Sequence, residues 1–267
     1  MFPANGIIPI HDENPTSIRP VVTFTLIALN VLAFFLWEPN FGSGRNCAEA
    51  DLRCQVADCE ITQFFFKWGV VPREVVEGDP LEGEICPGIE TEPKSLVASL
   101  FTSMFLHGGF MHLAGNMLFL WVFGNNIEDR LGHVKFLLFY LLTGVAASLA
   151  HVFFNADSIA PTIGASGAVS GLMGAYIVLF PHAMIHVLVP ILLFFRIRMR
   201  AISVLGIWFV SQFFIGGGQQ VGSGGVAWVA HVGGFVAGAL VIYLLGGGRN
   251  RPTPTRPAYP PPSPYGF

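Results

Sequence analysis

Apolar residues in this chain fall into long stretches that polar residues rarely interrupt. A helix needs roughly 17 to 25 such residues to span the hydrocarbon core of a bilayer. We therefore predict an all-α membrane protein with six transmembrane helices, at residues 21–37, 110–127, 136–154, 165–180, 201–215 and 226–245. The fourth and fifth stretches are short for a span.

The composition supports a membrane protein. Of 267 residues, 52% are hydrophobic and only 12% are charged, with 25 phenylalanines, which is far more apolar than a typical soluble domain. Basic residues are too few and too scattered for a nucleic-acid partner. Residues 1–19 contain a single basic residue, Arg19, and lack the basic start of a secretory signal. The first apolar stretch is therefore expected to remain as an anchor.

The distribution of basic residues predicts the topology. A further apolar stretch, 183–195, would be about 20 Å long as a helix, too short for a core of about 30 Å. If it does not cross, the basic residues Arg130, Lys135, Arg196, Arg198, Arg200, Arg249 and Arg251 all lie on the side of the N-terminus. The positive-inside rule then places both termini in the cytoplasm.

The long loop between the first two predicted helices, residues 38–99, differs from the rest. Residues 38–95 hold twelve Asp and Glu against five Lys and Arg, together with all four cysteines, Cys47, Cys54, Cys59 and Cys86. Such cysteines indicate two disulfides in an oxidising, extracytoplasmic compartment, with three pairings possible. Zinc is the competing interpretation, but the loop has no C-x-x-C pair, so we predict no metal. The apolar motif at residues 64–68 is expected on the membrane surface or on the protein.

The predicted domain organisation has three parts. Residues 1–19 form a cytoplasmic N-terminal segment, residues 20–246 a transmembrane domain, and residues 247–267 a disordered, proline-rich cytoplasmic tail. The glycine-rich segment 216–225 is a candidate for a movable cap on the outer side.

One hydroxyl, Ser166, lies where a chain held by Pro161 and Gly164 is expected to enter a helix of small residues. The unpaired N–H groups and the dipole of a helix N-terminus would stabilise an oxyanion formed beside it. Ser166 is therefore a candidate nucleophile. The nucleophile elbow of soluble hydrolases needs Gly two residues after the serine, where this chain has Ala168, so a different fold must hold this residue.

A second group of polar residues shares the predicted membrane depth of Ser166. The second, fourth and sixth predicted helices run in the same direction, which puts His112, Asn116 and His231 in its layer. Glycines four residues apart allow close helix packing: Gly167 and Gly171 on the fourth helix, Gly234 and Gly238 on the sixth. A serine beside a histidine base is a nucleophilic catalyst. Either residue alone is better explained by a hydrogen bond between helices, but their shared layer favours catalysis.

Three further sites receive roles from their spacing. His112 and Asn116 share a helix face and could donate hydrogen bonds to an oxyanion, although a hydrogen-bonded pair between helices is an equally good explanation. His107 is expected to have a structural role, bracing the loop before this helix. Glu128 and Arg130 are expected to form an interfacial ion pair that fixes the turn after it.

These motifs together resemble the rhomboid family of intramembrane serine proteases. The resemblance covers about residues 20–246 and rests on residues 107–112 with Asn116, on Glu128 and Arg130 before Gly132, on residues 164–167, and on residues 230–234 with Gly238. It implies a six-helix rhomboid-like bundle, a Ser166–His231 dyad that cleaves transmembrane segments of membrane-protein substrates, oxyanion stabilisation by His112 and Asn116, and no cofactor.

The chain departs from the family pattern at two places. Ser170 stands where some bacterial members have an aromatic residue that supports the histidine ring, so another residue must orient His231. The Trp-Arg pair found in the first outer loop of some members is absent from residues 38–99.

Two other functions remain open at this point. One is a non-catalytic rhomboid-like protein that binds membrane-protein clients for quality control. The other is a small transporter with His112 and His231 as proton sites. The presence of Ser166 and His231 together with the two oxyanion candidates counts against both.

Overall fold

The computed structural model describes residues 8–39, 52–86, 89–189, 195–216 and 228–247. Each of the six long apolar stretches coincides with a helix: α1 (Val21–Leu32) with its π-helical extension η1 (Ala33–Trp37), α5 (Phe110–Leu131), α6 (His133–Phe154), α7 (Ser166–Leu179), α8 (Ala201–Gly216) and α9 (Trp228–Leu244). The fold is therefore mostly helical, as the hydrophobic pattern predicts.

The helices differ in length and hydropathy. Within the described part of the chain, α6 alone is long and apolar enough to cross a membrane. Helix α5 meets the same criterion only together with α4 (Leu96–Thr102) and the 3₁₀ turn η2 (Ser103–Phe105), a pair bent by 84°. The other four are shorter apolar helices. By length and composition, one or two spans are evident.

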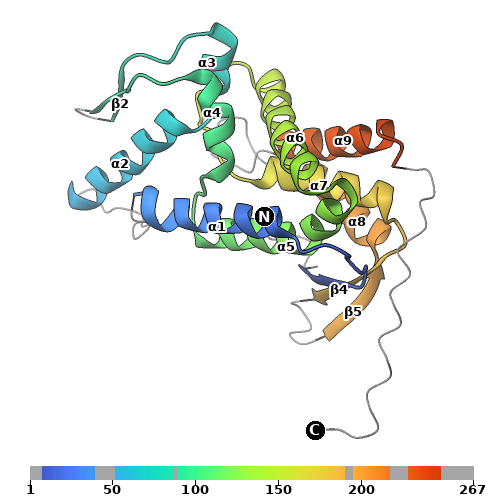
Figure 1. Ribbon diagram of the computed structural model, residues 1–267. Helices are drawn as coiled ribbons and strands as arrows, with labels where there is room; N and C mark the ends of the chain where they lie inside the picture. Colours follow the sequence, from blue (N-terminus) through green and yellow to red (C-terminus); the bar gives the residue numbers. More distant parts are fainter. Residues whose placement is uncertain (1–7, 40–51, 87–88, 190–194, 217–227, 248–267) are drawn as a thin grey trace, which may run out of the picture.

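Helix α7 forms the centre of the bundle, between α5, α6 and α9 (Figure 1). Its residues from Ser166 to Tyr176 are buried. The glycine faces of α7 and α9 meet: a Cβ added to Gly234 would lie 2.2 Å from the Gly167 carbonyl oxygen, and one on Gly238 would lie 1.9 Å from that of Gly171. Because no side chain fits between these backbones, α7 and α9 are in direct backbone contact at their glycines.

The turn between α5 and α6 corrects the predicted ion pair of Glu128 and Arg130. Glu128 is fully buried, and its carboxylate accepts hydrogen bonds from the backbone N–H groups of Val22 (2.8 Å) and Thr23 (2.7 Å) and from the Thr23 hydroxyl (2.7 Å). His133 Nδ1 lies 2.6 Å from the Glu128 Oε1, the oxygen that also accepts from Val22. The N–H groups at the start of α1 have no partner within the helix, so they are available to this carboxylate. Glu128 thus fastens α1 to α5.

A small antiparallel sheet lies at one end of the bundle, in the order β1 (Ile8–Asp12), β4 (Met184–Val189) and β5 (Phe195–Arg200). Of the segment 183–195, predicted not to cross the membrane, residues 184–189 thus form a strand and not a helix, which departs from the all-α prediction. The side chains of Ile185 and Val187 are buried against the helices. Asp12 accepts hydrogen bonds from the Tyr176 hydroxyl (2.8 Å) and the Asn126 amide (2.6 Å), which fastens the N-terminal strand to α7 and α5.

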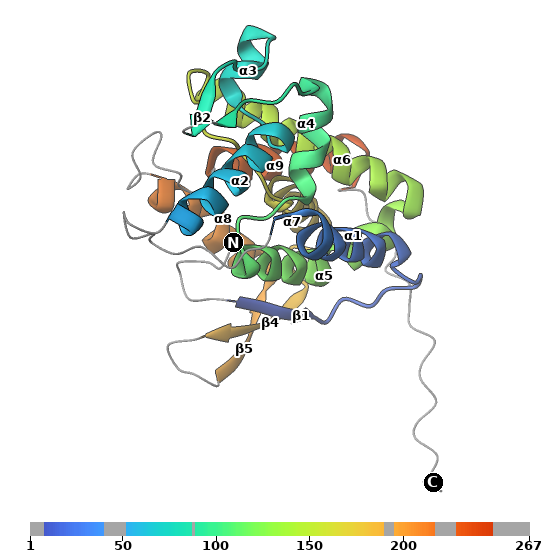
Figure 2. The same cartoon turned by 90° about the vertical axis from the view of Figure 1, so that its left-hand side faces the viewer.

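The loop after α1 folds into short elements at the opposite end from the sheet (Figures 1 and 2). They are α2 (Leu52–Trp68), α3 (Pro72–Glu77), the hairpin β2 (Glu84–Cys86) and β3 (Ile89–Glu90), and α4. The apolar motif 64–68 belongs to α2. Cys59 is disulfide-bonded, in agreement with the predicted disulfides, while the other three cysteine side chains lie outside the described residues.

A buried lysine joins these elements. The Lys94 ammonium pairs with the Glu74 carboxylate and donates to the carbonyls of Phe66 (2.7 Å) and Gly69 (3.2 Å) at the end of α2. Burial lowers the Lys94 pKa from its ordinary value, and the Glu74 carboxylate partly opposes this shift. The ammonium satisfies carbonyls that the helix terminus leaves unpaired.

Candidate active site

Ser166 is the first residue of α7, at the end of the bundle that carries the long loop. The preceding segment is held in place from both sides. Thr162 forms a two-hydrogen-bond bridge with Val70 (2.7 and 3.1 Å), and the Gly164 N–H donates to the Ser103 carbonyl at 2.8 Å. The serine is 8% exposed. The backbone that leads into Ser166 is therefore fixed by contacts from the long loop and from η2.

His231 of α9 and Ser166 are brought together. The imidazole Nε2 lies 2.9 Å from the Ser166 Oγ, and the His231 side chain is 4% exposed. The close packing of α7 on α9 at Gly167 and Gly234, one and three residues further along, produces this distance. This arrangement of a hydroxyl and an imidazole is the one a nucleophilic serine requires.

A third residue, Gln212 of α8, completes the contacts of the imidazole. Its Oε1 lies 2.8 Å from His231 Nδ1, and the side chain is 3% exposed. The sequence shows that His231 needs an orienting group other than Ser170, but it does not identify this one. Gln212 lies in an apolar stretch, where a lone buried amide is the only signal that could have pointed to it.

His112 lies against the backbone just before the serine. A Cβ added to Gly164 would lie 2.9 Å from His112 Cε1, 3.0 Å from its Nε2 and 3.6 Å from the Ser166 Oγ. Gly164 also has φ +123°, which side chains rarely adopt, so glycine is required there. The Gly108 N–H donates to His112 Nδ1 at 3.3 Å. A neutral imidazole that accepts at Nδ1 carries its proton on Nε2, the nitrogen on the side of Ser166.

Asn116 is fully buried one helical turn after His112. Its Nδ2 donates to the His112 carbonyl at 2.9 Å, within α5, so the pair is not a contact between helices. Its Oδ1 has no hydrogen-bond partner among the described residues. The amide nitrogen carries two N–H groups, and the bond to the His112 carbonyl uses one of them.

His107 is fully buried in the loop that joins η2 to α5. Its ring lies 5.2 Å from that of His112, and its backbone N–H donates to Glu38 Oε1 at 2.9 Å. Glu38 directly follows η1. This bond ties the loop that carries His107 to the end of α1, which fits the expected bracing role.

The Glu38 carboxyl makes the stability of the protein depend on pH. It is 6% exposed, and burial raises its pKa from 4.5 to about 7, although the hydrogen bond from His107 opposes the shift. Between these values the folded protein binds more protons than the unfolded chain, so the free energy of unfolding falls as the pH rises through the window. At about 1.4 kcal/mol per pKa unit, the loss is on the order of 3 kcal/mol.

We expect Glu38→Gln, which keeps an acceptor for the His107 N–H, to raise the Tm at about pH 8 and to leave it unchanged near pH 4.5. Thermal unfolding of parent and variant in the same detergent at both pH values measures this. Equal Tm values at the higher pH would contradict the assignment.

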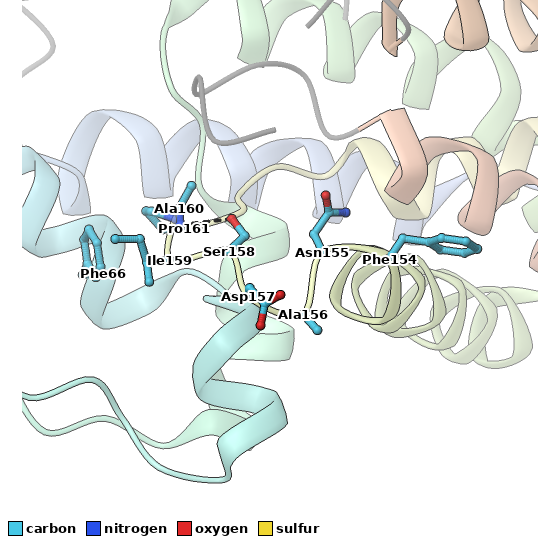
Figure 3. Close-up of a pocket in the computed structure, with 9 residues that line it drawn as sticks. All are labelled: Phe66, Phe154, Asn155, Ala156, Asp157, Ser158, Ile159, Ala160 and Pro161. Carbon is cyan, nitrogen blue, oxygen red and sulfur yellow. Dashed lines mark hydrogen bonds between the residues drawn. The ribbon is translucent and has the colours of Figure 1, made fainter. Parts of the chain in front are cut away.

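Figure 3 shows a pocket of about 430 Å³ between Phe66 of α2 and residues 154–161, which join α6 to α7. The Ser158 hydroxyl within it accepts the Ala160 N–H at 3.3 Å. None of its lining residues is a candidate catalytic residue, so this pocket is not the catalytic site. No group of three or more His, Cys, Asp or Glu with metal-binding geometry occurs among the described residues.

The geometry defines a class of protein: a helical bundle with a serine–histidine pair at the start of a central, glycine-rich helix. Residues 94–248 match the model of the Rhomboid domain. The chain belongs to the rhomboid family, whose members are integral membrane proteins.

Individual relatives come from several kingdoms. The chain is 32% identical over 157 residues to Rhomboid protease GluP of Bacillus subtilis, a match that covers 59% of this chain and 24% of that protein. It is 38% identical over 91 residues to Rhomboid protein 1, mitochondrial, of Saccharomyces cerevisiae, a match that covers 33% of this chain and 26% of that protein. It is 29% identical over 146 residues to RHOMBOID-like protein 5 of Arabidopsis thaliana, a match that covers 55% of this chain and 43% of that protein. The matches thus span less than half of each relative.

Proposed function

We propose that this protein is an intramembrane serine endopeptidase with Ser166 as nucleophile and His231 as general base and acid. The observation that carries the proposal is the 2.9 Å contact between the Ser166 Oγ and His231 Nε2, both buried inside the bundle. Membership of a family that includes proteins named as proteases supports it.

The chemistry follows from the positions of the two side chains. The Ser166 Oγ attacks the carbonyl carbon of a peptide bond while His231 Nε2 takes the hydroxyl proton. The tetrahedral intermediate collapses when His231 gives this proton to the departing amine, which leaves an ester on Ser166. Water then attacks the ester with His231 again as base, and the acid product leaves.

The oxyanion of the intermediate needs hydrogen-bond donors on the side of Gly164. The Ser166 backbone N–H at the α7 terminus is one, and His112 Nε2–H is the second, since the Gly108 N–H occupies the other ring nitrogen. The remaining N–H of Asn116 is the third.

Replacing His112 by alanine is expected to lower kcat about 100-fold with little change in KM, because the donor acts on charge that develops only in the transition state. The matched control is Met111→Ala, one residue earlier on α5, where the side chain is 60% exposed. Cleavage kinetics with a purified transmembrane reporter measure both. A His112→Ala variant that loses affinity but keeps kcat would contradict the oxyanion role.

The proposal includes a topology. Helices α1, α5, α6, α7, α8 and α9 cross the bilayer, the sheet and both termini face the cytoplasm of a bacterial cell, and the loop 38–99 faces outward. Residues 20–246 form the protease domain, flanked by the segment 1–19 and the tail 247–267. The opposite placement of the sheet and the long loop supports this orientation, as does the clustering of Arg196, Arg198 and Arg200 on β5. The candidate cap 216–225 lies almost entirely outside the described residues.

Substrates are transmembrane segments that enter from the lipid between α5 and α8. A peptide bond inside an intact helix is shielded by its own hydrogen bonds, so the segment must unwind near the cut. Segments with Gly or Pro near the site are expected to be cleaved faster than rigid helical ones, and equal rates would contradict this mechanism.

A fluorophosphonate probe tests the proposed activity. The parent protein in detergent or liposomes is expected to be labelled covalently at Ser166, and the Ser166→Ala variant is not. The non-catalytic alternative predicts no labelling of the parent, no cleavage, and client binding that is unchanged in Ser166→Ala. The transporter alternative predicts pH-driven flux in proteoliposomes.

A further inference from the structure

Helix α8 contacts the dyad through a single polar side chain. Gln212 Oε1 lies 2.8 Å from His231 Nδ1, on the side of the ring opposite the 2.9 Å contact to Ser166. The serine and the histidine come from α7 and α9, whose backbones meet at their glycines. Gln212 belongs to neither helix, so its contact depends on where α8 lies.

The orientation of the Gln212 amide is fixed by its neighbours. Its Nε2 donates to the Trp208 carbonyl at 3.3 Å and faces the Ser211 Oγ at 3.4 Å. The Ser211 hydroxyl itself donates to the Trp208 carbonyl at 2.6 Å and so accepts from the amide. The amide nitrogen is therefore engaged within α8, and the oxygen is the atom left to face His231.

An amide oxygen only accepts hydrogen bonds, so His231 must carry its proton on Nδ1. In a neutral imidazole, Nε2 then has the free electron pair that the Ser166 hydroxyl needs. In the opposite tautomer, the Nδ1 electron pair would face the Gln212 Oε1, which is also an acceptor, and Nε2–H could only donate to the Ser166 hydroxyl instead of taking its proton. Trp208 adds a second contact from α8: its ring lies 5.9 Å from that of His231 and stacks on Phe235 at 6.1 Å.

We propose that Gln212 is a positioning residue that selects the base-competent tautomer of His231, so that the dyad is active only while α8 is seated against α9. The proposal rests on the proposed protease function. Gln212 is neutral and cannot balance the imidazolium that forms during attack, so its contribution is orientation. A displacement of α8 that lengthens the Oε1–Nδ1 contact leaves the ring free to adopt the wrong tautomer.

Three variants test the assignment. Gln212→Met keeps the approximate volume but removes the acceptor, and Gln212→Glu keeps an acceptor at the same place. Val210→Ala is the control, because Val210 lies on the same helix with its side chain 52% exposed. The readouts are the rate of fluorophosphonate labelling as a function of pH, KM and kcat for a transmembrane reporter, and thermal stability.

We expect Gln212→Met to lower the labelling rate and kcat by about 10- to 100-fold with KM little changed, since only a fraction of the molecules then holds the productive tautomer. Gln212→Glu is expected to recover most of the rate at high pH, with the acid limb of the profile moved to higher pH, because a carboxylate stabilises the protonated ring. A merely structural residue would not move that limb. Gln212→Met labelled as fast as the parent, or Gln212→Glu as slow as Gln212→Met at every pH, overturns the proposal.

A second measurement separates this proposal from the protease function. In a Ser166→Ala background, ¹⁵N NMR of the labelled histidines reports the His231 tautomer without any turnover. We expect a protonated Nδ1 when Gln212 is present and a mixture of tautomers in Gln212→Met. The same spectrum with and without Gln212 overturns the role of Gln212, whereas a parent protein that the probe does not label overturns the proposed protease function.

Discussion

Replacing Ser166 with alanine is expected to abolish proteolysis, with a loss in kcat/KM of roughly 10⁴-fold or more. The variant keeps the helix but has no oxygen 2.9 Å from His231 Nε2 and so no nucleophile. His231→Ala should cost about as much, because an unactivated hydroxyl is a poor nucleophile. The double variant should lose no more than either single variant, since residues that act as one unit are not additive.

The controls for this prediction are Ser148→Ala on α6 and His182→Ala in the exposed turn before β4. They remove one hydroxyl and one imidazole at positions outside the candidate site. Cleavage of a transmembrane reporter in liposomes, measured against thermal stability, distinguishes lost chemistry from lost folding. A His231→Ala variant with substantial remaining activity would show that another group serves as the base.

Gly238→Val is expected to have the largest effect on stability. A Cβ at this position would lie 1.9 Å from the Gly171 carbonyl oxygen and 2.6 Å from its carbonyl carbon. These are backbone atoms that cannot rotate away, so α9 must move off α7. Overpacking of a core typically costs about 1–3 kcal/mol, and a rigid obstacle of this kind should reach or exceed the upper value. Activity should fall with stability, because the same displacement separates His231 from Ser166.

Gly206→Ala on α8 is the matched control. A Cβ at Gly206 meets nothing within 4 Å. Alanine is the better helix former by about 1 kcal/mol, so this variant should be as stable as the parent or slightly more stable. Thermal unfolding of both variants in the same detergent measures the difference. A Gly238→Val protein as stable as Gly206→Ala would mean that α7 and α9 do not pack through their glycines.

The sequence predicts the helices well, because long apolar stretches and regularly spaced glycines are local signals. The strand β4 carries no such signal: a short apolar run such as residues 184–189 reads equally as helix or strand. Its partner β1 lies more than 170 positions away along the chain. The predicted partner of Glu128 was wrong for the same reason, since the N–H groups it accepts from belong to α1, over 100 residues earlier.

The candidate site shows the same division. Ser166, His231, His112 and Asn116 could be singled out because polar residues at membrane depth are rare. Gln212 and Glu38 could not be assigned, because their partners are set by the packing of helices α8 and α1. A single buried amide or carboxyl gives no indication of the side chain it will meet.

The three-stranded sheet sets an order for the synthesis of this protein. Ile8 pairs with Leu188, and Asp12 pairs with Ile185. While the chain is being made, the first strand therefore has no partner until the ribosome has passed α1, α5, α6 and α7. The residues of β1 must stay unpaired throughout that time, and the sheet can close only after β4 and β5 have been made.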